Sequence, residues 1–252
     1  MLNKSREASI VFDGSFDGFL CVVYEVYYKK ITPVCIQTEA QITLADNPVS
    51  VNTDLSRAER VFSAIKEKIS RDAATRVYYA FLSYEPERFM AILQYIRLGF
   101  SVGHMVDSHL HEDCVSFVRK MASHAGKEAH LLLGFCRFAQ TKQGVLYCQI
   151  TPKNDVLALV ANHFSRRLMN ETWMIHDKNR DQAAVYDGNG FIITQVPKDA
   201  NIDYADGEEE VQEKWVAFFN SIAIESRTNK NLQRQMLPLY FRKNMTEFTK
   251  QK

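Results

Sequence analysis

Two strand-rich stretches decide the fold, GFCRFAQTKQGVLYCQI at Gly134–Ile150 and WMIHDKNRDQAAVYDGNGFIITQV at Trp173–Val196. Short runs of β-branched and aromatic residues alternate with glycine, asparagine and aspartate, as in strands joined by turns. Between the two stretches, Asp155–Leu168 carries apolar residues at helical spacing. The order β-β-α-β-β-β predicts an antiparallel sheet with helices on one face, and therefore the α+β class.

The expected strands are bounded by these turn residues. They are Phe135–Ala139, Val145–Ile150, Trp173–Asp177, Ala183–Tyr186 and Phe191–Val196. Asn154 and Asp155 are expected to cap the intervening helix, because asparagine and aspartate accept hydrogen bonds from free backbone amides at a helix start.

The preceding region, Leu55–Leu133, is predicted to be mostly helical. Asp54 or Ser56 can cap its first helix, and Ser70 or Asp72 can cap the second. Further upstream the chain is less regular. Thr32–Asn52 contains prolines and β-branched residues, so we expect irregular structure or short strands there.

The N-terminal segment predicts a strand at Ser9–Phe12, a turn at Asp13–Ser15, and a helix capped by Ser15. The apolar side of this helix is expected to carry Phe19, Leu20, Val23, Val26 and Tyr27. Glycines and a hydroxyl at a strand-to-helix junction can hold a phosphate on backbone amides. The alternative is a capped turn, which the two nearby aspartates favour because they repel an anion.

Composition limits the protein classes. The 252 residues are 46% hydrophobic and 24% charged, which is typical of globular proteins, and the net charge is +1. No apolar run approaches the roughly 18 residues of a membrane helix, so we expect no membrane association. Met1–Glu7 is polar, which predicts no secretion signal. Five cysteines without a CxxC pair predict reduced thiols in a cytoplasmic protein.

The C-terminal part changes the sign of its charge. Asp199–Glu213 contains acids and no base, so it predicts a linker or helix start. A helix is expected at about residues 208–227, with inward-facing Trp215, Phe218, Phe219 and Ile222. We therefore expect two domains. Residues 1–198 form an α+β domain, helical at about 55–133 and with its sheet at about 134–196, and residues 199–252 form an acidic linker, a helix and a basic helical tail.

The tail suggests nucleic-acid binding because it combines cations, amides and aromatic residues. Its candidate contact residues are Arg227, Lys230, Arg234, Tyr240, Arg242 and Lys243. An equally open alternative packs this tail against Asp199–Glu213. Arg166 and Arg167 share a helix face with His163, where they can bind phosphate or simply stabilise the helix end. We expect the helix and tail cations to share one DNA-binding surface.

Histidines suggest two further chemistries. His176, followed by Asp177, can act as an acid–base group, and His163 is a third candidate; the alternative for His176 is a structural role at a turn. Metal-ligating residue types also cluster at 104–114, but their spacing is irregular, which favours a polar connection between helices. The sequence therefore predicts no metal and no cofactor.

Several segments resemble a bacterial family of uncharacterised proteins assigned to DNA metabolism. The matching segments are Phe12–Leu20, Tyr95–Phe100, Lys127–Phe138, Pro152–Arg167, Trp173–Arg180, Tyr186–Gly188 and Trp215–Tyr240. Relatives are typically encoded beside a radical-SAM protein of DNA modification or repair. In some bacteria a similar domain is fused to a uracil-DNA-glycosylase-like domain. The family offers no established catalytic residues.

The resemblance implies an accessory protein of DNA repair or modification that binds single-stranded or damaged DNA and acts with a radical-SAM partner. The chain has no CxxxCxxC motif of its own for an iron–sulfur cluster. Two alternatives remain. One is an enzyme that acts on a nucleotide or damaged base through His and Asp acid–base groups. The other is a protein-interaction scaffold.

Overall fold

The computed structural model describes residues 6–39, 48–197 and 199–249. Contacts divide the chain into two compact units, Met1–Ala125 and Gly126–Lys252. The boundary lies within one helix, α5 (Asp113–Phe135). The domain boundary that the sequence suggests at residue 199 stays a prediction.

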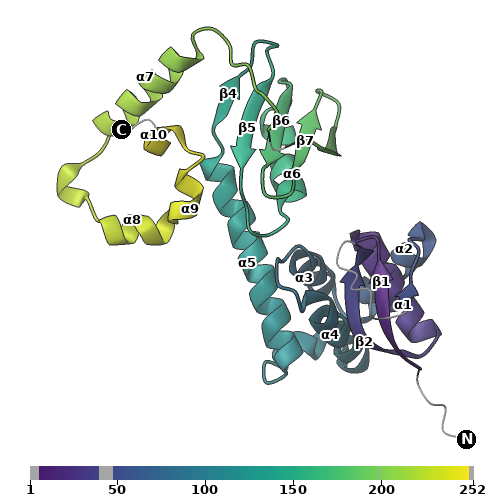
Figure 1. The fold of residues 1–252 in the computed structure, drawn as a ribbon. Helices are drawn as coiled ribbons and strands as arrows, with labels where there is room; N and C mark the ends of the chain where they lie inside the picture. The colour runs from purple at the N-terminus through teal and green to yellow at the C-terminus, as the bar shows by residue number, and fades with distance from the viewer. Residues whose placement is uncertain (1–5, 40–47, 198, 250–252) are drawn as a thin grey trace, which may run out of the picture. The chain divides into compact units, whose positions relative to one another are not determined.

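A parallel sheet forms one part of the N-terminal unit (Figure 1). The central strand β1 (Arg6–Phe12) pairs with β2 (Ile31–Thr38) and with β3 (Val49–Ser50). The expectation of irregular or short strands is wrong for β2, which is eight residues long. Pro33 lacks an amide donor, but β2 is an edge strand and tolerates it, and the register shifts beside it. Residues 40–47 of the expected region lie outside the described residues.

The turn after β1 is a capped helix start. Ser15 Oγ accepts a hydrogen bond from the Gly18 amide at 2.9 Å, which begins α1 (Phe16–Tyr28). The Asp13 carboxylate accepts from Ser15 and, at 2.7 Å, from the Thr53 hydroxyl. Burial opposes ionisation of Asp13, but these hydrogen bonds outweigh it and lower its pKa. Since a carboxylate already occupies this helix start, the capped-turn interpretation is favoured over a phosphate site.

The remaining N-terminal elements are helical, as the sequence predicts. They are α2 (Leu55–Lys68), α3 (Arg71–Phe81), α4 (Arg88–Val102), η2 (Gly103–Ser108) and the first part of α5. Of the alternative caps, Asp54 bonds the Arg57 amide and Ser70 bonds the Ala73 amide.

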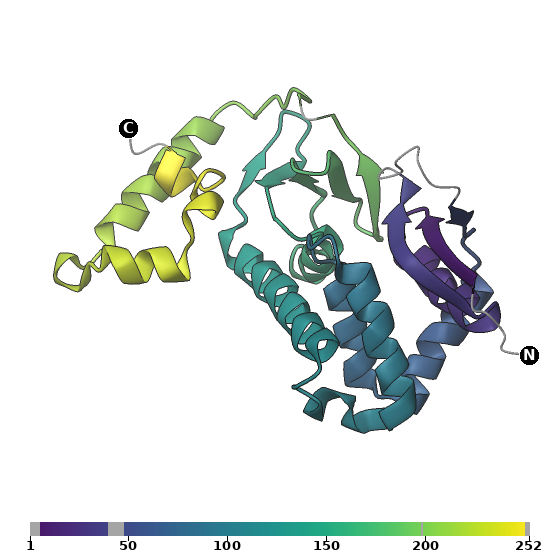
Figure 2. The ribbon, with the colours of Figure 1, turned by 60° about the horizontal axis from the view of Figure 1, so that its bottom comes forward.

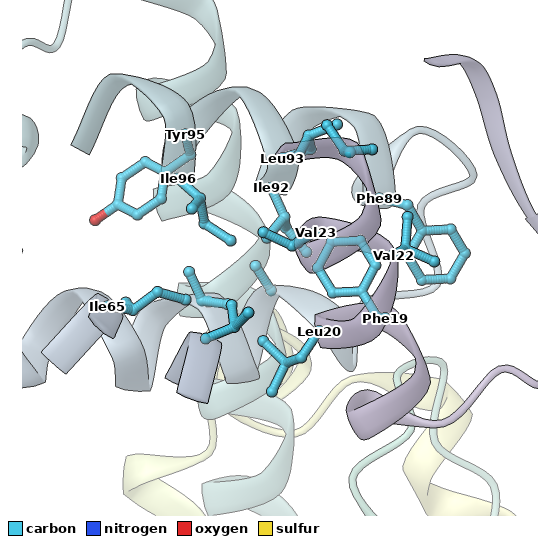
Figure 3. Close-up of a cluster of buried hydrophobic side chains, with 14 of the residues drawn as sticks. Phe19, Leu20, Val22, Val23, Ile65, Phe89, Ile92, Leu93, Tyr95 and Ile96 are labelled. Carbon is cyan, nitrogen blue, oxygen red and sulfur yellow. The ribbon is translucent and has the colours of Figure 1, made fainter. Parts of the chain in front are cut away.

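The core of this unit forms where α1, α2 and α4 meet (Figure 3). Fully or nearly fully buried side chains there include Phe19, Leu20, Val22, Val23, Ile65, Phe89, Ile92, Leu93 and Ile96. Among the described residues, Arg88–Ser108 is long and apolar enough to cross a membrane by length and composition alone. One side of α4, with Phe89, Ile92 and Leu93, is buried in this core. Tyr27, expected on the apolar side of α1, is instead 45% exposed.

The C-terminal unit contains a five-stranded sheet in the order β4-β5-β6-β7-β8. The strands are β4 (Phe138–Gln140), β5 (Leu146–Ile150), β6 (Trp173–Asp177), β7 (Gln182–Tyr186) and β8 (Phe191–Gln195). All neighbours are antiparallel except β5 and β6, which are parallel. A wholly antiparallel sheet is therefore the wrong prediction, because α6 (Leu157–Arg167) carries the chain across between β5 and β6. The α+β class is confirmed.

A buried carboxylate replaces the expected cap of α6. The N-cap residue is Val156, which makes no side-chain capping bond, so capping by Asn154 and Asp155 is wrong. The Asn154 backbone amide and side chain instead donate to Glu128 of α5, at 2.8 and 2.6 Å. Glu128 also accepts from the Lys153 amide at 2.9 Å, and it thereby holds the loop between β5 and α6 against α5.

The C-terminal helices follow the sheet (Figure 1). They are α7 (Glu208–Ser221), η3 (Glu225–Arg227), α8 (Lys230–Met236), α9 (Leu239–Arg242) and α10 (Thr246–Thr249). The expected helix to residue 227 therefore ends at Ser221. No residue of α7 is buried, and Phe218 and Ile222 are 54% and 59% exposed, so their inward orientation is also wrong.

Candidate nucleic-acid interface

Three cations on η3 and α8, Arg227, Lys230 and Arg234, form what we name the tail patch. All three side chains are exposed, and α8 buries no residue. Asn229 positions the last two by capping α8, since its side chain accepts from the Leu232 amide at 3.0 Å. Among the side chains that the structure describes, which do not include that of Glu225, none of the three makes an ion pair. Their charges are therefore available to an anionic ligand.

The segment that carries the tail patch is held at both ends. Before the tail patch, the Trp215 indole of α7 donates to Glu247 of α10 at 3.1 Å. Glu247 is 1% exposed and also accepts from Arg137 at 2.5 Å. Burial opposes ionisation of Glu247, but the Arg137 hydrogen bonds outweigh it and lower its pKa. At the other end, the Tyr240 hydroxyl donates to Glu128 at 3.2 Å. Between these anchors, the bend from α7 to α8 lies away from the sheet (Figure 2).

The acidic segment Asp199–Glu213 does not neutralise the tail patch. Glu208, Glu209 and Glu210 lie in the first turn of α7, where the positive end of the helix favours them. Glu208 accepts from the Gln140 amide, and Glu210 pairs with Lys214. No ion pair joins the segment to the tail patch in the described part of the chain. The end of the tail does lie against it, because α10 contacts α7 and Lys243 lines one hollow with Asp206 and Glu208. The alternative that the tail packs on this segment therefore fits the end of the tail but not the tail patch.

Three other tail candidates have different surroundings. Tyr240 lies against Phe241, with ring centroids 4.1 Å apart, and its hydroxyl is bonded to Glu128, so it is not free to stack on a base. Arg242 covers the Phe248 ring and donates to the Leu237 carbonyl. Both therefore stabilise the tail. Lys243 is exposed and lines a cavity beside β5.

The α6 candidates form a second basic patch. His163, Arg166 and Arg167 line a shallow hollow of about 430 Å³ together with Asn162. Arg166 donates to the Asn162 side chain at 3.4 Å. In both views, α6 and α8 lie on opposite sides of the C-terminal end of α5 (Figures 1 and 2). The structure therefore does not bring the helix and tail cations onto one surface; nucleic-acid binding by either patch stays a prediction.

The structure does not bring the acid–base candidates His163, His176 and Asp177 into one site. His176 and Asp177 are fully buried in β6, and neighbouring residues of a strand point to opposite faces. Asp177 accepts from the Asn179 amide and from Arg180, both at 2.9 Å, so it fixes a turn and does not orient His176. Burial raises the pKa of Asp177, and Arg180 opposes that shift. His163 lines the α6 hollow instead of this region.

Tyr147 is the partner of His176 that sequence reasoning missed. Its hydroxyl lies 3.0 Å from His176 Nδ1, across the β5–β6 pair. Burial raises the pKa of Tyr147 to about 12. Tyr147, Gln149 and Lys243 line a cavity of about 610 Å³, which is large enough for a small ligand. This hydrogen bond therefore links the wall of the cavity to the buried imidazole of His176.

His176 is expected to make the protein acid-sensitive. Burial and the charge of Lys178 lower its pKa below 6.5, so below that pH the unfolded chain binds a proton that the folded chain does not. The free energy of unfolding should then fall with decreasing pH, by up to about 1.4 kcal/mol per pH unit. His176→Gln should reduce this slope in urea denaturation between about pH 7 and pH 5. Replacing the exposed His130 by glutamine serves as control, and equal slopes in wild type and H176Q would contradict the account.

The clustered residues at 104–114 give no metal site. Among the described residues, no group of three or more His, Cys, Asp or Glu side chains is placed to hold a metal ion. Asp107 instead joins Arg76 and Tyr95, and His109 bonds the Met105 carbonyl at 2.8 Å. The expected absence of metal stays a prediction.

Comparisons with known proteins show which family the chain belongs to. No curated protein matches the chain. One family matches residues 86–247, from the start of α4 to α10, and is described as a domain of unknown function (DUF4130). The match includes both basic patches and the Tyr147–His176 pair. Because it covers more than half of the chain, the protein belongs to the DUF4130 family.

Proposed function

We propose that this protein is a nucleic-acid-binding accessory of DNA repair or modification that acts with a radical-SAM partner. The observation that carries the proposal is the tail patch, with exposed Arg227, Lys230 and Arg234 free of ion pairs in the described part of the chain. Arginine and lysine bind backbone phosphates and release counterions, which supplies most sequence-independent affinity for DNA.

The neighbouring groups fit a nucleic-acid backbone. Asn229 and Gln233 lie in the same short segment as the three cations, and such amides can bond sugar and phosphate oxygens. Because Tyr240 is held by Glu128 and Phe241, base stacking by this ring is not part of the proposal. The DNA-binding mode is therefore contact with the backbone, which single-stranded and damaged DNA both present.

The proposed protein partner is supported by apolar side chains beside the tail patch. Phe218, Ile222, Ile224, Leu232 and Met236 are each more than half exposed. Exposed apolar residues that gather on one segment favour a protein contact, while the adjacent cations face DNA. A pure interaction scaffold would use the apolar side chains alone, and the DNA-binding test below distinguishes the two.

The test is a charge-matched comparison. Arg227→Ala, Lys230→Ala and Arg234→Ala together should weaken binding to a single-stranded oligonucleotide about tenfold at low salt, because three phosphate contacts are lost. The control removes the same charge from exposed Lys120, Lys127 and Lys142. Fluorescence anisotropy measures affinity, and a melting curve confirms that both variants fold. Equal loss in the two triple variants would contradict a specific tail interface.

A second candidate function is an enzyme that acts on a nucleotide or damaged base. The observation that favours it is the cavity with Tyr147 in its wall and His176 behind Tyr147. Neutral His176 can accept a hydrogen bond from the Tyr147 hydroxyl and so orient that hydroxyl toward a ligand in the cavity. Turnover of modified nucleotides that is abolished by Tyr147→Phe, while DNA binding is retained, would establish this function. Turnover unaffected by Y147F would exclude the pair from catalysis.

A further inference from the structure

A row of tyrosines marks a second surface, in the N-terminal unit and mostly outside the matched family domain. Tyr24, Tyr27 and Tyr28 lie in the last two turns of α1, at spacings that place them on one side. Tyr27 is 45% exposed and Tyr28 is 74% exposed. The rings of Tyr24 and Tyr28 are nearly parallel, at 13°, with centroids 5.7 Å apart. The exposed rings of Tyr27 and Tyr28, together with the half-buried Tyr24 that packs against the core, form an aromatic wall.

The opposite wall belongs to α2 and is cationic. Arg60, Ala64 and Lys68 follow one another at single-turn intervals, so two long cationic side chains flank a short one. The small Ala64 side chain leaves a hollow of about 460 Å³ between the two walls. Phe100 of α4 also lines it and meets Tyr27 edge-on, with centroids 5.7 Å apart. We call this hollow the tyrosine slot.

The charges around the tyrosine slot favour an anion. Glu25, the nearest acid on α1, is already paired with Lys29 at 2.6 Å and with Arg57 at 2.7 Å. Glu59 and Glu67 each precede a lining cation on α2 and are exposed to solvent. Arg60 and Lys68 form no ion pair with any described residue. The slot therefore offers flat apolar rings on one side and available positive charge on the other.

We propose that the tyrosine slot binds a nucleotide. The base lies on the tyrosine wall, where stacking on aromatic faces is favourable for every base, and the phosphate lies between Arg60 and Lys68. A flat ring that carries an anionic group is the ligand chemistry that these two walls share. The nucleotide can be free, or it can be an unpaired nucleotide of a DNA strand. This site is independent of the tail patch and goes beyond the function proposed above.

The test uses two probes, free deoxyadenosine monophosphate and a 5′-phosphorylated single-stranded oligonucleotide. Ala64→Leu fills the slot without changing charge, and Tyr28→Ala removes part of the wall. Each should weaken nucleotide binding about tenfold or more in calorimetric titration, since stacking on one ring accounts for about that much. Ser56→Leu, at an exposed position of the same helix, is the matched control and should bind as wild type does.

The outcomes separate the possible occupants. Mononucleotide binding that is weakened by A64L indicates a free nucleotide, while oligonucleotide binding alone, weakened by A64L, indicates a strand. Mononucleotide binding by the triple alanine variant of the tail patch would show that the tyrosine slot is a separate site from the proposed tail interface. The proposal is overturned if neither probe binds or if A64L leaves binding unchanged. It is also overturned if A64L abolishes only self-association in sedimentation, because the slot then holds a second copy of the chain.

Discussion

Trp173→Ala is expected to lower the free energy of unfolding of the C-terminal unit by about 3–5 kcal/mol, as large-to-small replacements of buried aromatic residues do. Trp173 is fully buried in the middle strand, β6, and stacks on Tyr186 at 12° with ring centroids 5.1 Å apart. Alanine would leave a cavity beside both neighbouring strands. Urea denaturation, followed by far-UV circular dichroism, measures the loss.

Trp173→Phe is the matched comparison. The indole N–H of Trp173 is buried without a hydrogen-bond partner in the described chain, so phenylalanine loses no bond and leaves a smaller cavity. We expect it to cost only about 1–2 kcal/mol. Equal destabilisation by W173A and W173F would contradict the account, because the loss of stability would then not depend on the size of the cavity.

Glu128→Ala is expected to cost about 3 kcal/mol or more, because it leaves buried amide groups without acceptors. Glu128 is 5% exposed and accepts from the Lys153 and Asn154 amides, the Asn154 side chain and the Tyr240 hydroxyl. The loop before α6 and the start of α9 should loosen together. Hydrogen exchange should show faster amide exchange at both places.

Glu171→Ala provides the control for this change. Glu171 is an exposed carboxylate of the same unit, and surface replacements of this kind usually change stability by less than about 0.5 kcal/mol. A melting temperature of E128A equal to that of E171A would mean that the carboxylate does not hold the loop and the tail.

Elements with local signals could be predicted from the sequence. Ser15, Asp54 and Ser70 cap helices because the capping bond joins residues three apart, which a single sequence displays. The predicted bounds of β6, Trp173–Asp177, match the observed ones, because turn residues adjacent in the sequence mark where the strand ends. The predicted antiparallel pairing of β5 and β6 is wrong because α6 brings the chain back to pair the two strands in parallel. The sequence indicates this helix, but it does not show that the strands on either side of it are neighbours in the sheet.

The candidate site was harder to predict because its contacts are distant in the chain. Tyr147 meets His176 across two strands, and Glu128 meets Tyr240 from another helix. Helical periodicity finds one apolar side of α1 or α7, but it does not say whether a partner covers that side. Tyr27 and Phe218 were therefore expected inside and are exposed. The exposed cations of the tail patch were found by composition, since an unpaired charge needs no partner in the chain.

The salt dependence of DNA binding tests the central claim most directly. Anisotropy titrations of wild type with a labelled single strand, from about 50 to 200 mM salt, should give a slope of log affinity against log salt of about −2 or steeper, because three phosphate contacts release counterions. The triple variant at Arg227, Lys230 and Arg234 should flatten that slope by about 2. No binding by wild type at the lowest salt, or an unchanged slope in the variant, would contradict the account.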